Sequence, residues 1–279
     1  MSRLLVVNAD DMGLTPGVCR AIHRAHTNGV VTSTSVLAVG QAFDDAAALI
    51  ADTDRLGVGA HLALVGEDRP LLSAREIPSL VDREGRFPLS YRTFVRRAVA
   101  GRVDRNDVAR EFRAQLEKVS GIGVPVTHLD THQHTHLWPA VTSVVVQQAK
   151  DFGIRSVRLP TSRRRGPLGA AVRVLSARAR QRITAAGLVT TDDFAGLDEA
   201  GALDHPTFAG ALRYLTEGGA GTAEINTHPA EAGDPDIGRF DWGYLGPTEL
   251  AMLTDPATRD LITESGWQLG SFADLAAAA

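Results

Sequence analysis

Short apolar runs of β-forming residues alternate with helix-like stretches along the whole chain, and this alternation restricts the fold more than any other feature. The runs that we interpret as strands are 4–8, 31–39, 58–64, 126–131, 156–159, 188–194, 223–227 and 268–272. The first three runs are joined by 16–28 and 43–54, each about long enough for the crossover helix that parallel strands require. We therefore predict an α/β fold built on a parallel sheet or barrel.

Length, charge and cysteine content exclude several classes of protein. The 279 residues, 44% of them hydrophobic, suffice for a full core, and we predict a single domain over 1–279. With 29 basic and 33 acidic residues the net charge is −4, which disfavours nucleic acid as a partner. The lone cysteine, Cys19, excludes an intrachain disulfide and a thiolate metal cluster, so histidine must supply any nitrogen ligands.

The first apolar run is also too short for a signal peptide, because Asn8, Asp10 and Asp11 interrupt it. No window approaches the roughly 20 apolar residues of an integral membrane segment. We therefore predict a cytoplasmic protein.

Two neighbouring carboxylates, Asp10 and Asp11, stand at the C-terminal end of the first predicted strand. Like charges a few ångströms apart raise one pKa unless a cation or a donor network separates them. One aspartate could bind a divalent cation while the other serves as a base. The alternative is that they cap the helix beginning near Pro16, although Thr15 is better placed for that role.

Histidines follow two further predicted strands. His61 lies in the C-terminal half of an apolar run, where a histidine by itself is more often a core residue than a ligand. The densest histidine patch of the chain spans 127–139, and strand alternation puts His128, Asp130 and His132 on one side. His132, at the strand end, is best placed to bind a metal ion.

A helical arrangement of this patch would also pair His132 with His136, because ligands four residues apart share one helical face. We disfavour that arrangement, since Pro139 biases Trp138 to an extended conformation and better marks the start of the next helix.

A fourth polar cluster, at 224–229, ends another predicted strand and contains His228. His228 has the position of a general acid or base, and the alternative is an ordinary surface turn. In parallel α/β folds the C-terminal ends of the strands converge on one mouth, where active sites assemble. Two histidines and a carboxylate with open coordination positions are typical of a hydrolytic metal site.

Two segments interrupt the alternation. The segment 66–105 is rich in proline and glycine, and we interpret it as a long excursion over one face. The irregular segment 161–182 contains seven arginines. A solvated basic helix is the simplest interpretation, and a lid or a clamp for an anionic substrate is the alternative.

The sequence resembles the YdjC/ChbG family of carbohydrate deacetylases. The motifs extend from residue 7 to about residue 230, and their order is specific to the family although each motif alone is not. They lie at Val7 to Leu14, Gly29 to Ser35, Gly59 to Leu62, His128 to His136 and Thr227 to Pro229.

The resemblance implies a distorted (β/α) barrel of the polysaccharide-deacetylase type. It also implies removal of an N-acetyl group from an amino sugar with a divalent metal ion, Mg²⁺ or Zn²⁺. By position, the resemblance makes Asp11, His61 and His132 the metal ligands, Asp10 the base and His228 the acid. Relatives act on chitooligosaccharides, and one branch is linked to hopanoid biosynthesis. The sequence leaves open whether the protein forms a homodimer.

The chain departs from the family pattern at three positions, where Met12, Thr131 and Ala230 replace the frequent Phe, Ser and Gly. None of these changes removes a ligand atom, so they bear on the substrate more than on the metal.

Four residues are predicted to contact the substrate: His134, His136, Trp138 and Trp242. Tyr244 is a further candidate for stacking on a sugar, and ordinary packing is the alternative for these aromatic residues.

Two rival functions use the same ligands. A non-haem iron oxygenase also needs two histidines and one carboxylate, but its triad does not require the spare carboxylate of Asp10. A sugar-binding protein stabilised by a metal ion would need neither Asp10 nor His228.

Overall fold

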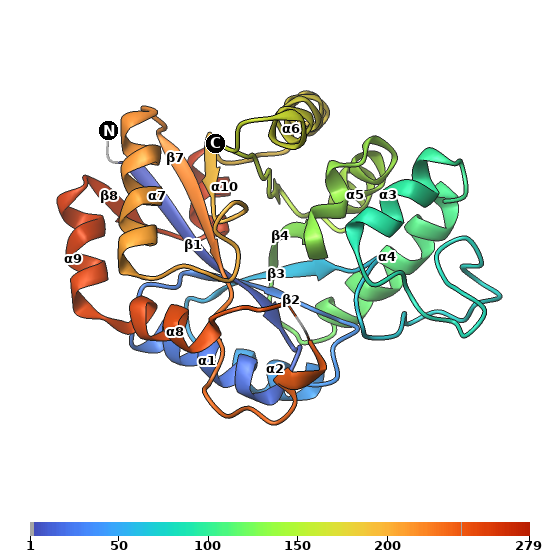
Figure 1. The fold of residues 1–279 in the computed structure, drawn as a ribbon, viewed down its shortest axis with the longest axis horizontal. Coiled ribbons are helices and arrows are strands. Elements are labelled where there is room, and N and C mark those ends of the chain that lie inside the picture. Colours follow the sequence, from blue (N-terminus) through green and yellow to red (C-terminus); the bar gives the residue numbers. More distant parts are fainter. Residues whose placement is uncertain (1–2, 241) are drawn as a thin grey trace.

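In the computed structural model, which describes residues 3–240 and 242–279, eight parallel strands form one curled sheet (Figure 1). The strand order is β5-β4-β3-β2-β1-β7-β6, and β8 pairs with the first residues of β1. An isolated bridge between Ser156 and Val189 brings the two ends of this path together. The predicted distorted barrel is therefore confirmed as an incompletely closed parallel sheet. The strands are β1 (Arg3–Met12), β2 (Ser33–Val36), β3 (Gly57–Leu62), β4 (Val126–Thr131), β5 (Ser156–Val157), β6 (Asp193–Ala195), β7 (Thr222–Thr227) and β8 (Trp267–Leu269).

Helices surround the sheet because parallel strands need crossover connections. Thr15 caps the first helix by accepting a hydrogen bond from the backbone of Val18, and Asp104 caps the fourth helix. Pro139 begins the fifth helix, as predicted. The helices are α1 (Pro16–Thr27), α2 (Phe43–Ala51), α3 (Tyr91–Val99), α4 (Arg105–Ser120), α5 (Pro139–Asp151), α6 (Pro167–Ala185), α7 (His205–Glu217), α8 (Gly246–Thr254), α9 (Pro256–Glu264) and α10 (Phe272–Ala278), with the short 3₁₀ segments η1 (His132–Leu137) and η2 (Ile237–Arg239).

The observed strands differ from the predicted ones mainly at their ends. β1 continues past the predicted end at residue 8 to Met12, because β2 and β7 pair with it on either side. By contrast, the predicted strand 188–194 is observed only as Asp193–Ala195. Before it, Val189 forms an isolated bridge with Ser156. The polar cluster of β1 is thus held inside the sheet rather than in a loop after it.

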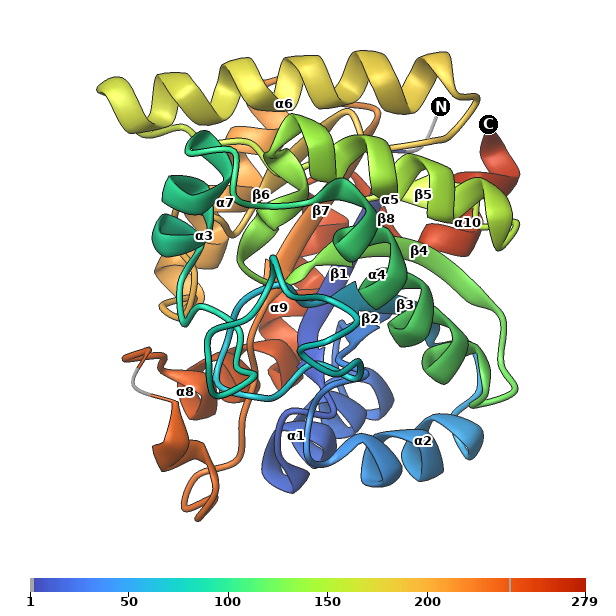
Figure 2. The ribbon, with the colours of Figure 1, turned by 90° about the vertical axis from the view of Figure 1, so that its right-hand side faces the viewer.

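The two unusual segments lie around the C-terminal ends of the strands. The loop-rich stretch after β3 runs to α3, in agreement with the predicted excursion. The arginine-rich segment forms helix α6 from Pro167 onward, and most of its surface is exposed. It runs alongside α5 and contacts η1 (Figure 2). In the described part of the chain, no helix combines the length and apolar character that crossing a bilayer requires.

Candidate metal and catalytic centre

The polar ends of β1, β3, β4 and β7 converge on the floor of a cavity of about 760 Å³. Asp10, Asp11, His61, His132 and His228 all line it. The convergence of the four polar clusters predicted from strand ends is therefore observed.

The backbone at Asp11 departs from regular β-structure. Its φ angle is +68°, a conformation that residues other than glycine rarely adopt, and the pairing of β1 with β2 shifts register between Ala9 and Met12. Simple alternation would send the side chains of Asp10 and Asp11 to opposite faces. Because the strand bulges at this point, both carboxylates line the same cavity. Local strain of this kind is typical of functional sites.

Three potential ligand atoms form a tight triangle, which we call the ligand cluster: Asp11, His61 and His132. His132 Nδ1 lies 3.1 Å from Asp11 Oδ1 and 3.3 Å from His61 Nε2, and His61 Nε2 lies 3.5 Å from Asp11 Oδ1. Ligand atoms about 2.1 Å from a tetrahedral zinc ion would be about 3.4 Å apart. The spacing of these three side chains therefore fits a shared divalent cation.

Asp130 orients the His61 ring. Its Oδ1 lies 2.7 Å from His61 Nδ1, which leaves Nε2 facing the ligand cluster. Burial alone lowers the pKa of His61, but the carboxylates of Asp130, Asp10 and Asp11 outweigh burial and raise this pKa to about 9. A carboxylate behind a metal-binding histidine is a common arrangement, because it fixes the ring and increases its basicity.

Arg158 is completely buried beneath the floor of the cavity and connects three acidic side chains. Its Nη1 and Nη2 donate to Asp10 at 2.7 and 2.6 Å, Nη1 also lies 2.7 Å from Asp130, and Nε donates to Glu224 at 2.7 Å. We call Arg158, Asp10, Asp130 and Glu224 the arginine cluster.

The environment of Asp10 keeps its carboxylate ionised. Burial raises the pKa of Asp10, but Arg158, together with His61 and His228, outweighs burial and holds this pKa well below its usual value. The side-chain amides of Asn8 and Asn226 donate to Asp10 at 2.8 and 3.3 Å. Glu224 differs, because its burial outweighs the attraction of Arg158 and raises its pKa to about 8.

A second set of acidic and histidine side chains, Asp10, His61 and Asp130, is also close enough to hold an ion. Arg158 already contacts both of its carboxylates at 2.6 to 2.7 Å. A positive guanidinium at that distance repels a cation, so the ligand cluster is the better metal site.

His228 stands at the end of β7, on the other side of Asp10 from the histidine patch. Its Nε2 lies 3.9 Å from Asp10 Oδ2, and its backbone N–H donates to Glu249 at 2.6 Å. Its Nδ1 atom is buried without a hydrogen-bond partner among the described residues. The Tyr244 ring packs at a centroid distance of 4.8 Å from the imidazole and restricts its orientation.

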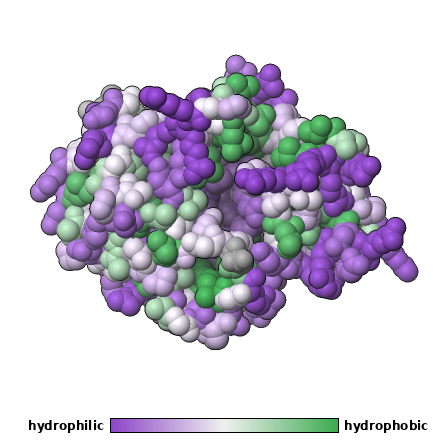
Figure 3. All heavy atoms as spheres, viewed as in Figure 1, coloured by the Kyte–Doolittle hydropathy of each residue, from purple (hydrophilic) through white to green (hydrophobic). Residues whose placement is uncertain are grey.

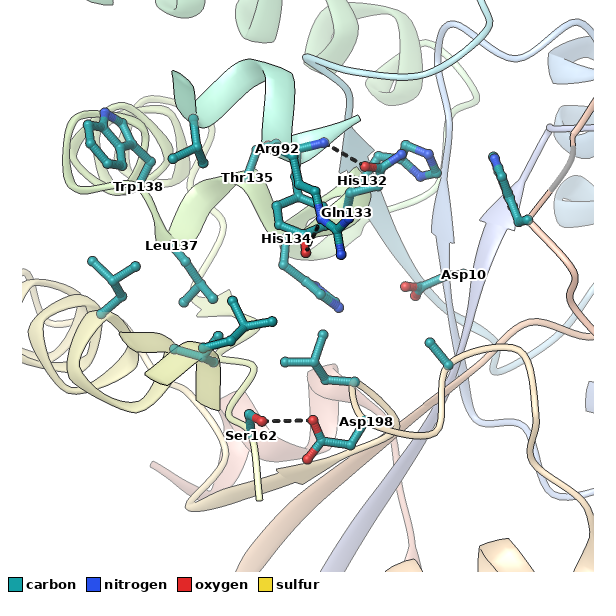
Figure 4. Close-up of a pocket in the computed structure, with 18 of the residues that line it drawn as sticks. Asp10, Arg92, His132, Gln133, His134, Thr135, Leu137, Trp138, Ser162 and Asp198 are labelled. Carbon is teal, nitrogen blue, oxygen red and sulfur yellow. Dashed lines mark hydrogen bonds between the residues drawn. The ribbon is translucent and has the colours of Figure 1, made fainter. Parts of the chain in front are cut away.

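The residues predicted to contact substrate divide into two groups. His134, Trp138 and Trp242 line the cavity, and His134 lies between Asp10 and the Trp138 end (Figure 4). His136 is fully buried outside the lining, and its two ring nitrogens contact the Thr131 hydroxyl at 2.7 Å and the Arg158 carbonyl oxygen at 3.1 Å.

Sequence reasoning did not assign roles to Arg158, Asp130 or Glu224. The sequence did contain a signal for two of these buried charges. Arg158 interrupts the short apolar run 156–159, and Glu224 stands within a buried strand. Charged residues are almost never fully buried unless they are paired. However, Arg158 lies 66 residues from Glu224 and 148 residues from Asp10 along the chain.

The family model for YdjC-like proteins matches residues 4–264. Chitooligosaccharide deacetylases of Yersinia pestis (strain Pestoides F) and Yersinia pseudotuberculosis serotype O:1b (strain IP 31758) are each 32% identical over 275 residues, which is 98% of this chain and 100% of each relative. The crystal structure of a proposed cellobiose-phosphate cleavage protein from Enterococcus faecalis V583 is 25% identical, with 99% of both chains covered and a TM-score of 0.84. The chain therefore belongs to the YdjC-like family.

Proposed function

We propose that the protein is a metal-dependent deacetylase, which hydrolyses the N-acetyl group of an amino sugar or short oligosaccharide. The observation that carries this proposal is the adjacency of two differently equipped aspartates. Asp11 belongs to the ligand cluster, whereas Asp10 is held apart from it by Arg158 and faces the same cavity. The names of the Yersinia relatives, chitooligosaccharide deacetylases, support the same reaction.

The ligand cluster would hold the ion through one carboxylate and two imidazoles. Imidazole nitrogen suits zinc and related transition metals better than magnesium, which prefers an all-oxygen environment, so we favour Zn²⁺ over Mg²⁺. A bound divalent ion would lower the pKa of a water molecule and polarise the amide carbonyl.

Asp10 and His228 would move the protons of the reaction. Asp10 is ionised and can accept the proton of the attacking water, while Arg158, Asn8 and Asn226 keep its carboxylate in place. His228, on the other side of Asp10, would donate a proton to the departing amine. Amide hydrolysis needs both steps, because without a donated proton the nitrogen would have to leave as a strongly basic anion rather than as a neutral amine.

We propose that Trp242 and His134 contact the substrate close to the reacting groups. Trp242 lies at a ring-centroid distance of 5.3 Å from His132 and is anchored by a hydrogen bond of 3.0 Å from its Nε1 to Glu67. His134 lines the cavity with an unpartnered, buried Nδ1. Burial and the positive charge of Arg158 hold the pKa of His134 well below its usual value, so the ring is neutral and can bond a sugar hydroxyl. We do not include His136 among the substrate contacts, because it is fully buried and does not line the cavity.

The decisive experiment measures acetate released from N-acetylated amino sugars, oligosaccharides and glycolipids, with and without added divalent metal. We expect metal-dependent acetate release that does not require oxygen. Oxygen-dependent turnover would instead support an oxygenase, and tight sugar binding without turnover would support a binding protein.

A further inference from the structure

Glu224 is a buried acidic residue that the proposed reaction does not use. It lies within β7, is completely buried and does not line the cavity, which opens as the hollow at the centre of one face of the molecule (Figure 3). Arg158 Nε donates to its Oε1 at 2.7 Å, whereas Oε2 is buried without a hydrogen-bond partner among the described residues. Because Glu224 does not reach the substrate space, any role in the reaction must act through Arg158.

Glu224 and the two aspartates of the arginine cluster bind different edges of the Arg158 guanidinium. Nη1 and Nη2 donate to Asp10 at 2.7 and 2.6 Å, and Nη1 also lies 2.7 Å from Asp130. Nε carries a single hydrogen, which Glu224 accepts. Since the guanidinium is a planar, rigid fork, a fixed Nε sets the direction in which both Nη atoms point. Glu224 therefore helps to set where the positive charge faces Asp10.

The charges of the arginine cluster are unbalanced if all three acids are ionised, because one buried guanidinium would face three carboxylates. Burial raises the pKa of Asp10 and of Asp130, but Arg158 together with neighbouring histidines outweighs burial and lowers both. Burial, with the negative charges of Asp10 and Asp130, instead outweighs Arg158 at Glu224 and raises its pKa to about 8. At neutral pH Glu224 therefore keeps its proton.

The hydrogen bonds of Glu224 agree with a neutral carboxyl. An ionised carboxylate offers about four acceptor sites, and a buried one needs several donors. Glu224 receives one donor, from Arg158. The other charged groups around it are Asp10 of β1 and Asp130 of β4. On β6, its pairing partner is Phe194, which has no titratable group and whose ring centroid lies 5.9 Å from Arg158 Cζ.

We propose that Glu224 is a positioning residue, whose neutral carboxyl holds Nε of Arg158 and thereby directs the guanidinium at the base, Asp10. The proposal rests on the deacetylase function above and concerns the same centre. A neutral acceptor anchors the guanidinium without competing for its charge, which Asp10 and Asp130 then share. Displacement of a catalytic group by about 1 Å lowers a rate by as much as about 10²-fold. The alignment of Asp10 with the attacking water thus depends on a residue outside the cavity.

The test compares kcat, KM and metal content of Glu224→Met and Glu224→Gln at saturating metal. Glu224→Met removes the acceptor for Nε at similar volume, so kcat should fall at least about tenfold while KM changes less than about twofold. Glu224→Gln is the conservative variant. It keeps a neutral oxygen acceptor and should restore kcat to within about threefold of the wild-type value. Both variants should retain the metal, because Glu224 does not contact the ligand cluster.

Glu111→Met is the matched control for the loss of a buried glutamate. Glu111 is also completely buried, but it accepts the backbone N–H groups of Leu71 and Leu72 and does not line the cavity. Its replacement should lower stability and leave kcat of the folded protein unchanged. A tenfold loss of kcat in Glu224→Met alone would therefore report on Arg158 rather than on a weakened fold.

A second measurement detects the proton on Glu224 without turnover. An acid whose pKa is raised on folding makes the protein less stable as pH increases between the unfolded and folded pKa values, here 4.5 and about 8. The unfolding constant of the wild type, divided by that of Glu224→Gln, should therefore rise about tenfold per pH unit in this interval and level off above it. Urea denaturation at several pH values measures the ratio. A constant ratio would show that Glu224 is ionised in the folded protein and would overturn the proposal.

The kinetic results separate this role from the others. Equal losses of kcat in Glu224→Met and Glu224→Gln would refute it, because a neutral acceptor would then not suffice. Unchanged kcat in Glu224→Met would also refute it and leave the deacetylase function intact. Loss of metal in Glu224→Met would do the same, because the residue would then act on the ligand cluster.

Two further outcomes are decisive as well. If Glu224→Met does not fold, Glu224→Gln decides alone, and a kcat below about a tenth of the wild-type value contradicts the proposal. If no substrate releases acetate, the deacetylase function fails and the positioning role fails with it. The unfolding ratio would then still show whether Glu224 holds a proton.

Discussion

The ligand cluster and the arginine cluster share one cavity floor but handle buried charge in opposite ways. In the arginine cluster, the guanidinium of Arg158 lies within 2.7 Å of Asp10, Asp130 and Glu224. In the ligand cluster, the side-chain contacts of Asp11 within the described residues are with two imidazole rings, at 3.1 and 3.5 Å. The first cluster is complete as it stands, whereas the geometry of the second fits a cation.

This difference teaches how two adjacent residues of the same type can acquire different functions. Asp10 and Asp11 are neighbours in the sequence and both are buried, yet only Asp10 reaches the guanidinium. The left-handed backbone at Asp11 turns its carboxylate toward His132 instead. The partner of each carboxylate, rather than its chemical identity, decides whether it binds metal or accepts a proton.

The largest expected effect is on metal retention and turnover. His61→Ala and His132→Ala should each lose the metal ion and almost all acetate release, because each removes one of three protein ligands. Metal content by mass spectrometry and turnover at saturating metal measure this. Chelation of the wild-type protein should abolish turnover, and a divalent ion should restore it. Full metal occupancy in both variants would show that other residues bind the ion.

Arg158→Met should destabilise the protein by about 3–5 kcal/mol, the usual cost of leaving buried charges without their partner. Denaturant unfolding measures this loss. Arg164→Met is the matched control, because the Arg164 side chain is 62% exposed, and its unfolding free energy should change by less than about 1 kcal/mol. Equal stabilities for the two variants would mean that the arginine cluster contributes no net stabilisation.

Asp10→Asn and Asp11→Asn should separate the two clusters functionally. Asp10→Asn should keep most of its metal and lower kcat by roughly 10²-fold or more, as expected when a general base is removed. Asp11→Asn should weaken metal binding, because a neutral amide replaces the only anionic ligand. Metal content and kcat at saturating metal are measured on both. The opposite pattern would reverse the two assignments, and unchanged turnover in both would refute hydrolysis at this centre.

The smallest expected effect is a pH dependence of metal affinity. His61 has a pKa raised to about 9 without metal, so its charged form predominates at pH 7 and must lose a proton to bind an ion. The apparent affinity should therefore rise by about tenfold per pH unit below pH 9 and level off above it.

Calorimetry at pH 7 in buffers of different ionisation enthalpy should detect this release of about one proton on metal binding. His134→Gln is the control and should show the same release, because the His134 pKa is already well below its usual value. Metal binding without proton release would contradict the protonated state of His61.

Much of the centre could be inferred from short sequence patterns. The βα alternation predicted the parallel sheet, and the polar strand ends predicted which residues would meet, because parallel strands present their C-terminal ends at one edge. Thr15 and Asp104 as caps and Pro139 as a helix start followed from local rules and are confirmed.

The sequence by itself determined which strand ends carry reactive groups, since hydrophobic periodicity and capping act over a few residues. Only the tertiary structure decided how the charges are paired. Arg158 meets Asp10 and Glu224 across 148 and 66 residues of chain, and the bulge at Asp11 depends on the strands that flank β1. Local patterns likewise did not show that part of the arginine-rich segment lines the cavity, because this cavity exists only once α6 packs on α5 and η1. Electrostatic pairing and cavity shape are properties of distance in space, and local sequence patterns do not encode them.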